Sequence, residues 1–375
     1  MAGLNVPEMN LAGMNVVALG GGTGLSTLLK GLKKYVREER ANHGSLQQRR
    51  KRAVGSGLTL RHLSAIVTVS DDGGSSGRLR REFRVSPPGD IRNCMVALSE
   101  DEALLSRLFQ FRFASGRGLK GHSFGNLFLT ALTGVTGDFQ EAVTVSGEVL
   151  AIRGHIYPST MEDVTLTAEL ENGRTVQGET RISRSLSRIA RLRLVPPNCR
   201  PLPQALEAIA QADVITVGPG SLYTSLIPNL LVRGVSKAMA RSRAARIFIC
   251  NLMTQPGETS RYTAADHIRA VYEHCGAPLF DYVVVNSQPI PAALRKRYLA
   301  GRSQPVEADE AEMRQLGVRV IAADLLAGDA TPGKVRHHPE RLSQVVLDIA
   351  AAHNKISGHS RPKHAHKSRD LQATS

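Results

Sequence analysis

The sequence predicts an α/β protein built on a doubly wound, mainly parallel sheet. Short apolar runs of strand length recur along the chain, and glycine-rich or polar turns follow them. Most of these turns lead into segments with the spacing of an amphipathic helix. Strands that alternate with helices form βαβ units, which place their strands in parallel. One stretch alternates polar and apolar residues instead, and it predicts an antiparallel excursion.

The expected strands share short, continuous apolar runs. They are residues 15–19, 63–69, 214–217, 247–250, 282–285 and 318–321. Helical spacing follows, for example, at residues 25–32 and 263–275. In open sheets of this kind, ligands bind in the crevice beyond the carboxyl ends of the strands. The loops that follow the strands are therefore where we expect the site.

Residues 163–194 carry the antiparallel excursion. Polar and apolar residues alternate on both sides of Glu171-Asn172-Gly173, and Asn-Gly is typical of a type I′ hairpin turn. We expect this β-hairpin to be inserted into, or to lie beside, a single domain that spans residues 14–353. Residues 1–13 then form an N-terminal extension, and residues 354–375 form a tail.

Composition narrows the class of protein. Of the 375 residues, 42% are hydrophobic and 22% are charged, which excludes a disordered or collagen-like chain. The four cysteines lie far apart without a CxxC pair, which favours a reducing compartment and argues against structural zinc. No apolar run reaches the length of a membrane span, and Glu8 stands where a signal peptide would be basic. We expect a cytoplasmic protein without a membrane span.

The net charge of +15 is concentrated in two segments. Residues 37–61 carry a net +5 and residues 357–375 a net +3. Both segments are poor in apolar residues, so we expect a flexible basic insertion and a disordered basic tail. Aromatic residues make up 4% of the chain and tryptophan is absent, so stacking platforms for single-stranded nucleic acid are scarce. We therefore expect no specific nucleic-acid binding.

A glycine-rich loop follows the first expected strand and opens a helix. Its residues Gly21, Gly22, Thr23 and Gly24 let the backbone approach a phosphate, and the helix start presents free N–H groups. The loop is no Walker A motif, because no Lys-Ser/Thr pair follows it. It is no GxGxxG motif either, because Leu25 replaces the third glycine. The alternative is a tight turn without a ligand.

Asp71 and Asp72 end the second expected strand. A Rossmann-type site places an acid about 20 residues beyond the glycines, where it holds a ribose hydroxyl. Asp71 lies 47 residues after Gly24, and removal of the 25-residue insertion 37–61 leaves 22. The two carboxylates could instead bind Mg²⁺ that neutralises a diphosphate, or they could merely cap a turn.

Further polar loops extend the candidate site. Asp90 is expected as the N-cap of a helix, with Arg92 one turn in, where it could face an anion. Asn126, close after His122, could read a base or a phosphate, whereas His122 itself is expected to be an ordinary hydrogen-bonding residue. Later strands lead into the loops that contain Gly220, Ser221 and Asn251.

Six motifs occur in order along the chain: GGGTG, SDDGGSSGRLR, PPGDIRN, GHSFGNL, GPGSLYTS and NLMTQPGET. In these motifs the sequence resembles the bacterial gluconeogenesis factor family, also described as cell-morphogenesis factors. That family belongs to the superfamily of 2-phospho-L-lactate transferases. The resemblance extends over about residues 15–353 and omits the extension, the insertion and the tail.

The resemblance implies a Rossmann-like core with a nucleotide-binding cleft. Members of the morphogenesis branch bind UDP-sugars, notably UDP-N-acetylglucosamine, and support cell shape and cell-wall supply during gluconeogenic growth. The transferase branch moves a phospholactyl group from a guanylyl donor to a deazaflavin hydroxyl. By this resemblance, the glycine loop and Asn251 hold the nucleotide, and Asp71, Asp72 and Asp90 match the metal or acceptor region. Arg336 is a candidate for the diphosphate or sugar, or else a solvated surface cation.

Three hypotheses follow. The first is a UDP-sugar-binding regulator with no established activity, which works with protein partners of cell-envelope synthesis or as a homo-oligomer. The second is a Mg²⁺-dependent transferase that moves a phosphoryl-linked group from a nucleotide to an alcohol. The third is an RNA-binding or scaffold protein that acts through its basic segments. The first hypothesis is favoured, and Mg²⁺ with a bound nucleotide is the one cofactor that it allows.

Overall fold

A parallel sheet of seven strands forms the centre of the computed structural model, which describes residues 13–37, 58–100, 104–185, 187–328 and 333–357. The strands lie in the order β10-β9-β8-β7-β1-β2-β3, and their pairings are parallel. Their bounds are β1 Met14–Gly20, β2 Leu60–Val67, β3 His155–Pro158, β7 Val214–Val217, β8 Ala245–Ile249, β9 Tyr282–Asn286 and β10 Arg319–Ala323. The predicted α/β class with a mainly parallel sheet is confirmed.

The sheet grows outward from β1 in two directions. The chain first adds β2 and β3 on one side of β1, and then places β7, β8, β9 and β10 on the other. This is the strand order of a Rossmann-like sheet, in which ligands bind at the point of reversal. Leu19 of β1 pairs with Val217 of β7, so the loops that leave these two strands begin side by side.

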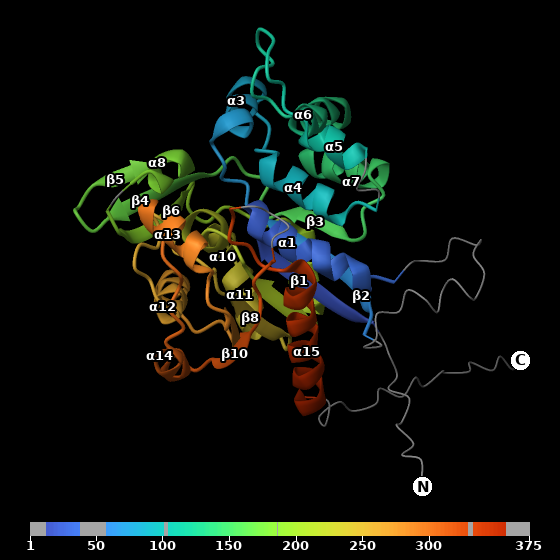
Figure 1. Cartoon of the computed structure of the whole chain (residues 1–375). Helices are drawn as coiled ribbons and strands as arrows, with labels where there is room; N and C mark the ends of the chain where they lie inside the picture. The colour runs from blue at the N-terminus through green and yellow to red at the C-terminus, as the bar shows by residue number, and fades with distance from the viewer. Residues whose placement is uncertain (1–12, 38–57, 101–103, 186, 329–332, 358–375) are drawn as a thin grey trace, which may run out of the picture.

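Helices cover both faces of this sheet (Figure 1). Successive residues of β1 face opposite sides, so Val16 and Ala18 join one core, and Val17 and Leu19 join the other. The first core includes α1 Gly22–Leu32, α4 Gly89–Leu98 and α15 Pro339–Ser357. The second core includes α9 Pro203–Gln211, α10 Ile227–Leu231, α11 Val235–Arg241 and α12 Ala264–Cys275.

A group of helices connects β2 to β3 and lies at the top of Figure 1. Besides α4 it contains α3 Gly74–Phe83, α5 Leu105–Gln110, α6 Phe124–Thr136 and α7 Phe139–Val149. The remaining short segments are a 3₁₀ turn Lys33–Tyr35, a π-helical turn Leu222–Leu226, α13 Ala292–Ala300 and α14 Glu310–Gln315. In the part of the chain that is described, no helix has the length and apolar character to cross a membrane.

A small antiparallel sheet lies beside the main one, as expected for residues 163–194. Its order is β5-β4-β6, with β4 Thr165–Leu170, β5 Thr175–Gln177 and β6 Ile189–Val195. Gly173 in the β4–β5 turn has a φ of +79°, which explains why glycine follows Asn172 there. The short helix α8 Glu179–Ser183 leads from β5 toward β6 and packs against β4.

Several element limits differ from the predictions. The edge strand β3 was not predicted, and β2 begins at Leu60, inside the range expected for the insertion. Helix α15 continues to Ser357, inside the range expected for the tail. The rest of those two segments and residues 1–12 lie outside the described residues. All four cysteines are free, and Cys94, Cys199 and Cys250 are buried.

Candidate functional site

A pocket of about 220 Å³ lies at the carboxyl ends of β1, β7 and β8. Five segments that are distant in sequence form its wall: the glycine loop, the turn after β7, the turn after β8, α13 and the stretch before α15. The lining residues are Gly21, Gly22, Thr23, Gly24, Thr27, Pro219, Gly220, Ser221, Ser225, Asn251, Leu252, Met253, Gln255, Tyr298, Val335, Arg336 and His337. The pocket therefore sits at the switch point of the sheet.

Each glycine of the first loop occupies its position for a different structural reason. Gly21 is the N-cap of α1 and has no side chain that could accept a hydrogen bond from the first turn. The backbone N–H groups of this turn therefore have no side-chain acceptor from the N-cap. Gly22 has a φ of +62° with open space where a Cβ would lie. A Cβ on Gly24 would overlap the carbonyl oxygen of Pro219. The two glycine-rich turns thus touch, and only Gly22 has open space beyond its backbone.

Asn251 holds the second glycine turn in place. Its Nδ2 donates to the carbonyl of Gly220 at 2.7 Å, and its Oδ1 accepts from the Gly220 amide at 3.1 Å. Gln255 acts on the next residue, because its Nε2 donates to the Ser221 hydroxyl at 2.8 Å. These amide side chains position the wall of the pocket.

The outer wall comes from α13 and from residues 333–337. Tyr298 of α13 accepts a hydrogen bond at its hydroxyl from the Val335 amide, at 3.0 Å. Arg336 lines the pocket, and it forms no ion pair with the residues that the structure describes. His337 is buried, which lowers its pKa to about 4 and keeps its ring neutral at pH 7. Arg336 is therefore the cation of this wall.

Asp90 lies directly behind the glycine loop. It stands in the first turn of α4 and Pro88 is the N-cap, so the expectation that Asp90 itself caps this helix is wrong. A Cβ on Gly21 would meet the Oδ2 atom of Asp90, and the Gly22 amide hydrogen-bonds its carboxylate. Burial, and next the charge of Asp71, raise the pKa of Asp90 to about 6.

Four carboxyl groups form an acidic cluster beside the pocket: Asp71, Asp90, Glu179 and Glu258. Burial is the largest cause that raises the pKa of each of them. The charges of the other three raise the pKa of Glu179 further. Such a cluster favours bound protons or a nearby cation, because ionised carboxylates at close range repel one another.

Asp72 has a different environment from Asp71. Its Oδ1 accepts hydrogen bonds from the Thr180 amide at 2.9 Å and from the Thr180 hydroxyl at 2.7 Å. Asp72 thereby ties the loop after β2 to α8. Asp71 accepts from the Gly73 amide at 2.8 Å. Within the described residues, no three His, Cys, Asp or Glu side chains form a group that could hold a metal ion. A Mg²⁺ ion here would need the phosphate oxygens of a ligand as well.

Asn126 and Arg92 lie apart from the glycine pocket. Asn126 is 2% exposed in the first turn of α6, and its Nδ2 donates to the Ser76 hydroxyl at 3.4 Å. Arg92 is buried, and its guanidinium donates to the Phe109 carbonyl at 3.4 Å and to the Asn93 side chain at 2.8 Å. His122 contacts the Ser75 hydroxyl at 2.9 Å, as expected of a hydrogen-bonding residue.

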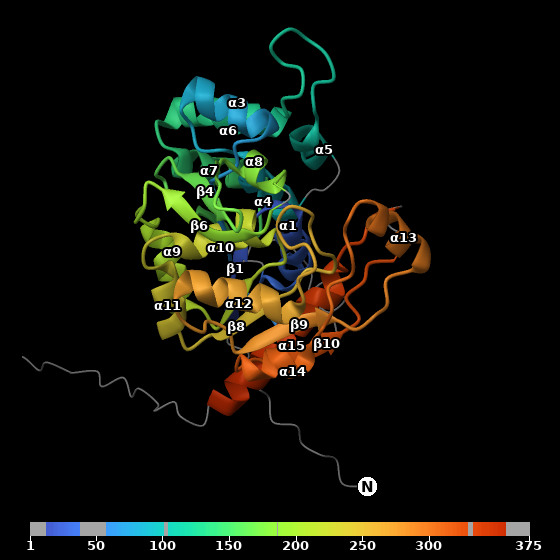
Figure 2. The ribbon, with the colours of Figure 1, turned by 90° about the vertical axis from the view of Figure 1, so that its left-hand side faces the viewer.

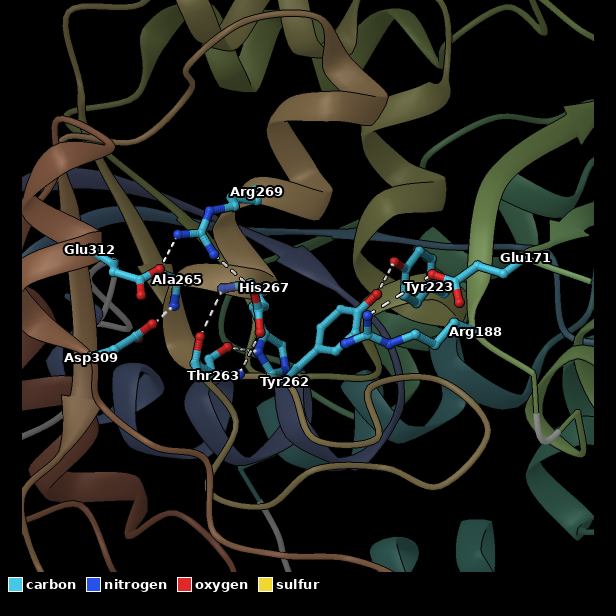
Figure 3. A network of polar contacts seen from close by, with 11 residues as sticks. Glu171, Arg188, Tyr223, Tyr262, Thr263, Ala265, His267, Arg269, Asp309 and Glu312 are labelled. Atoms are coloured by element: carbon cyan, nitrogen blue, oxygen red, sulfur yellow. Dashed lines mark hydrogen bonds and ion pairs between the residues drawn. The ribbon is translucent and has the colours of Figure 1, made fainter.

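Glu258 and two tyrosines hold the turn after β7 against the loop before α12. Glu258 accepts hydrogen bonds from the Tyr223 amide and the Thr224 hydroxyl, both at 3.1 Å. The hydroxyls of Tyr223 and Tyr262 face each other at 2.8 Å, and the Arg188 guanidinium lies 5.1 Å from the Tyr262 ring centre (Figure 3). Arg188 directly precedes β6, so this contact joins the start of β6 to the loop before α12.

The structure brings most predicted nucleotide-binding residues into one pocket and leaves two outside it. Those inside are Gly21, Gly22, Thr23, Gly24, Gly220, Ser221, Asn251 and Arg336. Those outside are Asp71 and Asn126, and Asp72, which was predicted as a metal ligand, also lies outside. The lining residues Gln255, Tyr298 and His337 were not predicted. Gln255 lies in the NLMTQPGET motif and His337 directly follows the candidate Arg336, whereas Tyr298 lies on a helix without a motif.

These features define a doubly wound α/β protein with a glycine-rich pocket at its switch point. The family model of 2-phospho-L-lactate transferase CofD matches residues 16–326. The gluconeogenesis factor of Bacillus subtilis is 42% identical over 334 residues, which are 89% of this chain and 97% of that relative. The gluconeogenesis factor of Halalkalibacterium halodurans is 43% identical over 334 residues, 89% of this chain and 96% of that relative.

A crystal structure of a Bacillus halodurans protein has the same fold, with a TM-score of 0.79, at 43% sequence identity over 89% of this chain and 99% of that chain. A second crystal structure from the same organism gives a TM-score of 0.81 at 43% identity. The chain belongs to the gluconeogenesis factor family, whose domain is of the 2-phospho-L-lactate transferase CofD type.

Proposed function

We propose that this protein binds a nucleotide sugar of the UDP-N-acetylglucosamine kind in the glycine pocket. The observation that carries the proposal is the convergence of Gly22, Ser221 and Arg336 on one pocket at the switch point. Backbone N–H groups at a helix start and a guanidinium are the donors that phosphate oxygens prefer. The pocket wall also contains hydroxyl and amide side chains, which can orient the neutral part of such a ligand.

The proposed role is that of a cytoplasmic regulator. In this role, occupancy of the pocket reports the supply of nucleotide sugar and adjusts cell shape and cell-wall synthesis during gluconeogenic growth. In this role the protein acts on partner proteins of cell-envelope synthesis, and it does so as a monomer or as a homo-oligomer. Membership of the gluconeogenesis factor family supports this role.

Calorimetric titration tests the binding proposal. The ligands are UDP-N-acetylglucosamine, UDP-glucose, GDP and NAD, each with and without Mg²⁺. We expect micromolar binding that is confined to the UDP-sugars. The absence of binding to all four ligands would contradict the proposal. A preference for GDP that Mg²⁺ strengthens would favour a transferase.

The variant Gly22→Val tests where the ligand binds. Its side chain would enter the open space beside Gly22, so we expect the affinity for UDP-N-acetylglucosamine to fall at least tenfold, about 1.4 kcal/mol. Gly173→Val is the matched control, because Gly173 also has a positive φ and open space but lies in the β4–β5 turn. Equal affinities of a folded Gly22→Val and the wild type would remove the loop from the site.

The acidic cluster favours a second candidate function, a Mg²⁺-dependent transferase of a phosphoryl-linked group. A regulator that only binds anions gains nothing from Asp71 and Asp90 so close to the glycine loop. In a transferase these carboxylates could share a Mg²⁺ ion with the ligand phosphates. Turnover of a nucleotide-linked donor that Asp90→Asn abolishes, while nucleotide binding persists, would support this candidate over the first.

A further inference from the structure

A second cavity of about 210 Å³ lies beside the glycine pocket, and we call it the β8–β9 slot. It is lined by Cys250, Asn251, Leu252, Ala264, Val285, Asn286, Gln288, Pro289, Ile290, Arg295, Pro305, Val306 and Ala308. Asn251 and Leu252 line both cavities, so the two are neighbours across the turn after β8. The slot opens over the carboxyl ends of β8 and β9.

The glycine pocket alone is small for a nucleotide sugar. Sites for ligands of that size usually measure about 300–1,000 Å³, whereas the glycine pocket measures about 220 Å³. The phosphates can occupy it, but a base and a sugar need further room. The β8–β9 slot nearly doubles the available volume.

The opposite direction, toward β2, is filled by the protein itself. A Cβ on Gly21 would meet the Oδ2 atom of Asp90 and the Cγ2 atom of Thr68, so side chains already stand on that side of the loop. In a dinucleotide fold, the acid at the end of the second strand holds the ribose on this side. Here Asp71 does not line the pocket, and the neighbouring cavity lies toward β8 and β9 instead.

The slot has the chemistry of a nucleobase site. Most of its wall is apolar, and the side chains of Leu252, Ile290 and Val306 belong to that part. A hydroxyl-rich sugar would leave its polar groups unpaired against such a wall, whereas a flat base buries its faces there. The slot therefore suits the base better than the sugar.

Two polar side chains of the slot remain suited to contact a ligand. The Asn251 and Asn286 amides are used within the protein, by Gly220 and by Gln288 and Leu325 respectively. Gln288 and Arg295 are exposed at the slot. A glutamine amide offers one acceptor and two donors, which match the hydrogen-bonding edge of a base.

From these observations we infer that the β8–β9 slot holds the nucleobase of a nucleoside diphosphate whose phosphates lie at the glycine loop. This inference rests on the proposed nucleotide-sugar binding and adds the direction in which the ligand lies. Uracil and guanine share the flat shape and the polar edge that the slot requires, so the base is resolved by experiment.

The variant Ala308→Phe tests the inference. Ala308 is exposed and lines the slot, so a phenylalanine there would fill it from its rim. Ala293→Phe is the control, because Ala293 is equally exposed on α13 but lines neither cavity. Each protein is titrated with UDP, GDP, UDP-N-acetylglucosamine and inorganic pyrophosphate, and the last of these needs only the glycine pocket.

For each nucleotide that the wild type binds, we expect Ala308→Phe to lower the affinity at least tenfold. The affinity for pyrophosphate should change less than twofold. Ala293→Phe should bind all ligands as the wild type does. The ligand among UDP and GDP that loses more affinity identifies the base. If Ala308→Phe leaves nucleotide affinity unchanged, or weakens pyrophosphate binding as much as nucleotide binding, the inference about the slot is wrong. The proposed function is not affected by either result. A wild type that binds pyrophosphate but no nucleotide overturns the proposed function, and the inference falls with it.

Discussion

At the scale of single residues, Asp90 couples the glycine loop to the acidic cluster. Its carboxylate is held by the Gly22 amide, which favours the ionised form, while burial and Asp71 favour the protonated form. The second influence is the larger, because the pKa rises to about 6. Folding therefore raises the pKa of this carboxyl toward neutral pH.

The raised pKa of Asp90 makes stability depend on pH. A carboxyl whose pKa is higher in the folded than in the unfolded protein favours folding when it is protonated. The wild type should thus lose about 1–3 kcal/mol from this group as the pH rises from about 4 to about 6. Asp90→Asn removes that loss, because its amide carries no charge.

Urea unfolding of both proteins between pH 4 and pH 8 measures this difference. The unfolding free energy of Asp90→Asn minus that of the wild type should increase with pH up to about pH 6. Above pH 6 this difference should stay constant. Two curves that run parallel over the whole range would show that the pKa of Asp90 is not raised by folding.

At the scale of elements, the Tyr223–Tyr262 pair joins the π-helical turn after β7 to the loop before α12 (Figure 3). Figure 2 shows β4 and α8 above α12, with β6 beside α10. The Tyr223 side chain is 2% exposed, so its hydroxyl depends on the Tyr262 hydroxyl rather than on water. The contact thus combines a buried hydrogen bond with the Arg188 guanidinium over the Tyr262 ring.

Tyr262→Phe should destabilise the protein by about 1–3 kcal/mol, because it leaves a buried hydroxyl unpaired. The double variant Tyr223→Phe/Tyr262→Phe should be no less stable than Tyr262→Phe, because it removes both polar groups. Urea unfolding of the wild type, both single variants and the double variant measures the coupling. Strictly additive losses would mean that the two hydroxyls do not interact.

The elements were predictable to different degrees. The strands at the centre of the sheet are buried on both faces, so continuous apolar runs marked β1, β7 and β9 to within a residue or two. Strand β3 was missed, because an edge strand of four residues with His155 and Pro158 carries little apolar signal. The hairpin was predicted because Asn172-Gly173 acts locally, on its own turn.

At the scale of the whole molecule, the described residues that flank 38–57 and precede 358–375 lie at the end of the sheet opposite to the pocket. The Arg37 amide donates to the carbonyl of Leu60, the first residue of β2, so Arg37 lies at the amino end of this strand. Asn354 contacts Met14, the first residue of β1. The pocket lies at the carboxyl ends, about 25 Å away along a strand of this length.

Deletion of residues 38–57 and 358–375 should therefore leave the affinity for UDP-N-acetylglucosamine within twofold of the wild type. Arg37 already hydrogen-bonds the Thr59 hydroxyl at 3.0 Å, so a short linker can join the cut ends. Calorimetric titration of the shortened protein checks this. Loss of UDP-sugar binding in a folded deletion variant would assign the basic segments to the site, and loss of RNA binding alone would favour the scaffold hypothesis.

The sequence by itself determined the α/β class, the glycine loop, the hairpin turn and membership of the family. Each of these depends on burial periodicity, on turn residues or on short ordered motifs, which act over a few neighbouring residues. Tertiary structure alone decided that Asp90 lies behind Gly21, that Asp72 holds Thr180, and that Arg336 reaches the pocket. Those pairs are far apart in the chain, and the order of strands in the sheet brings them together, which no local pattern encodes.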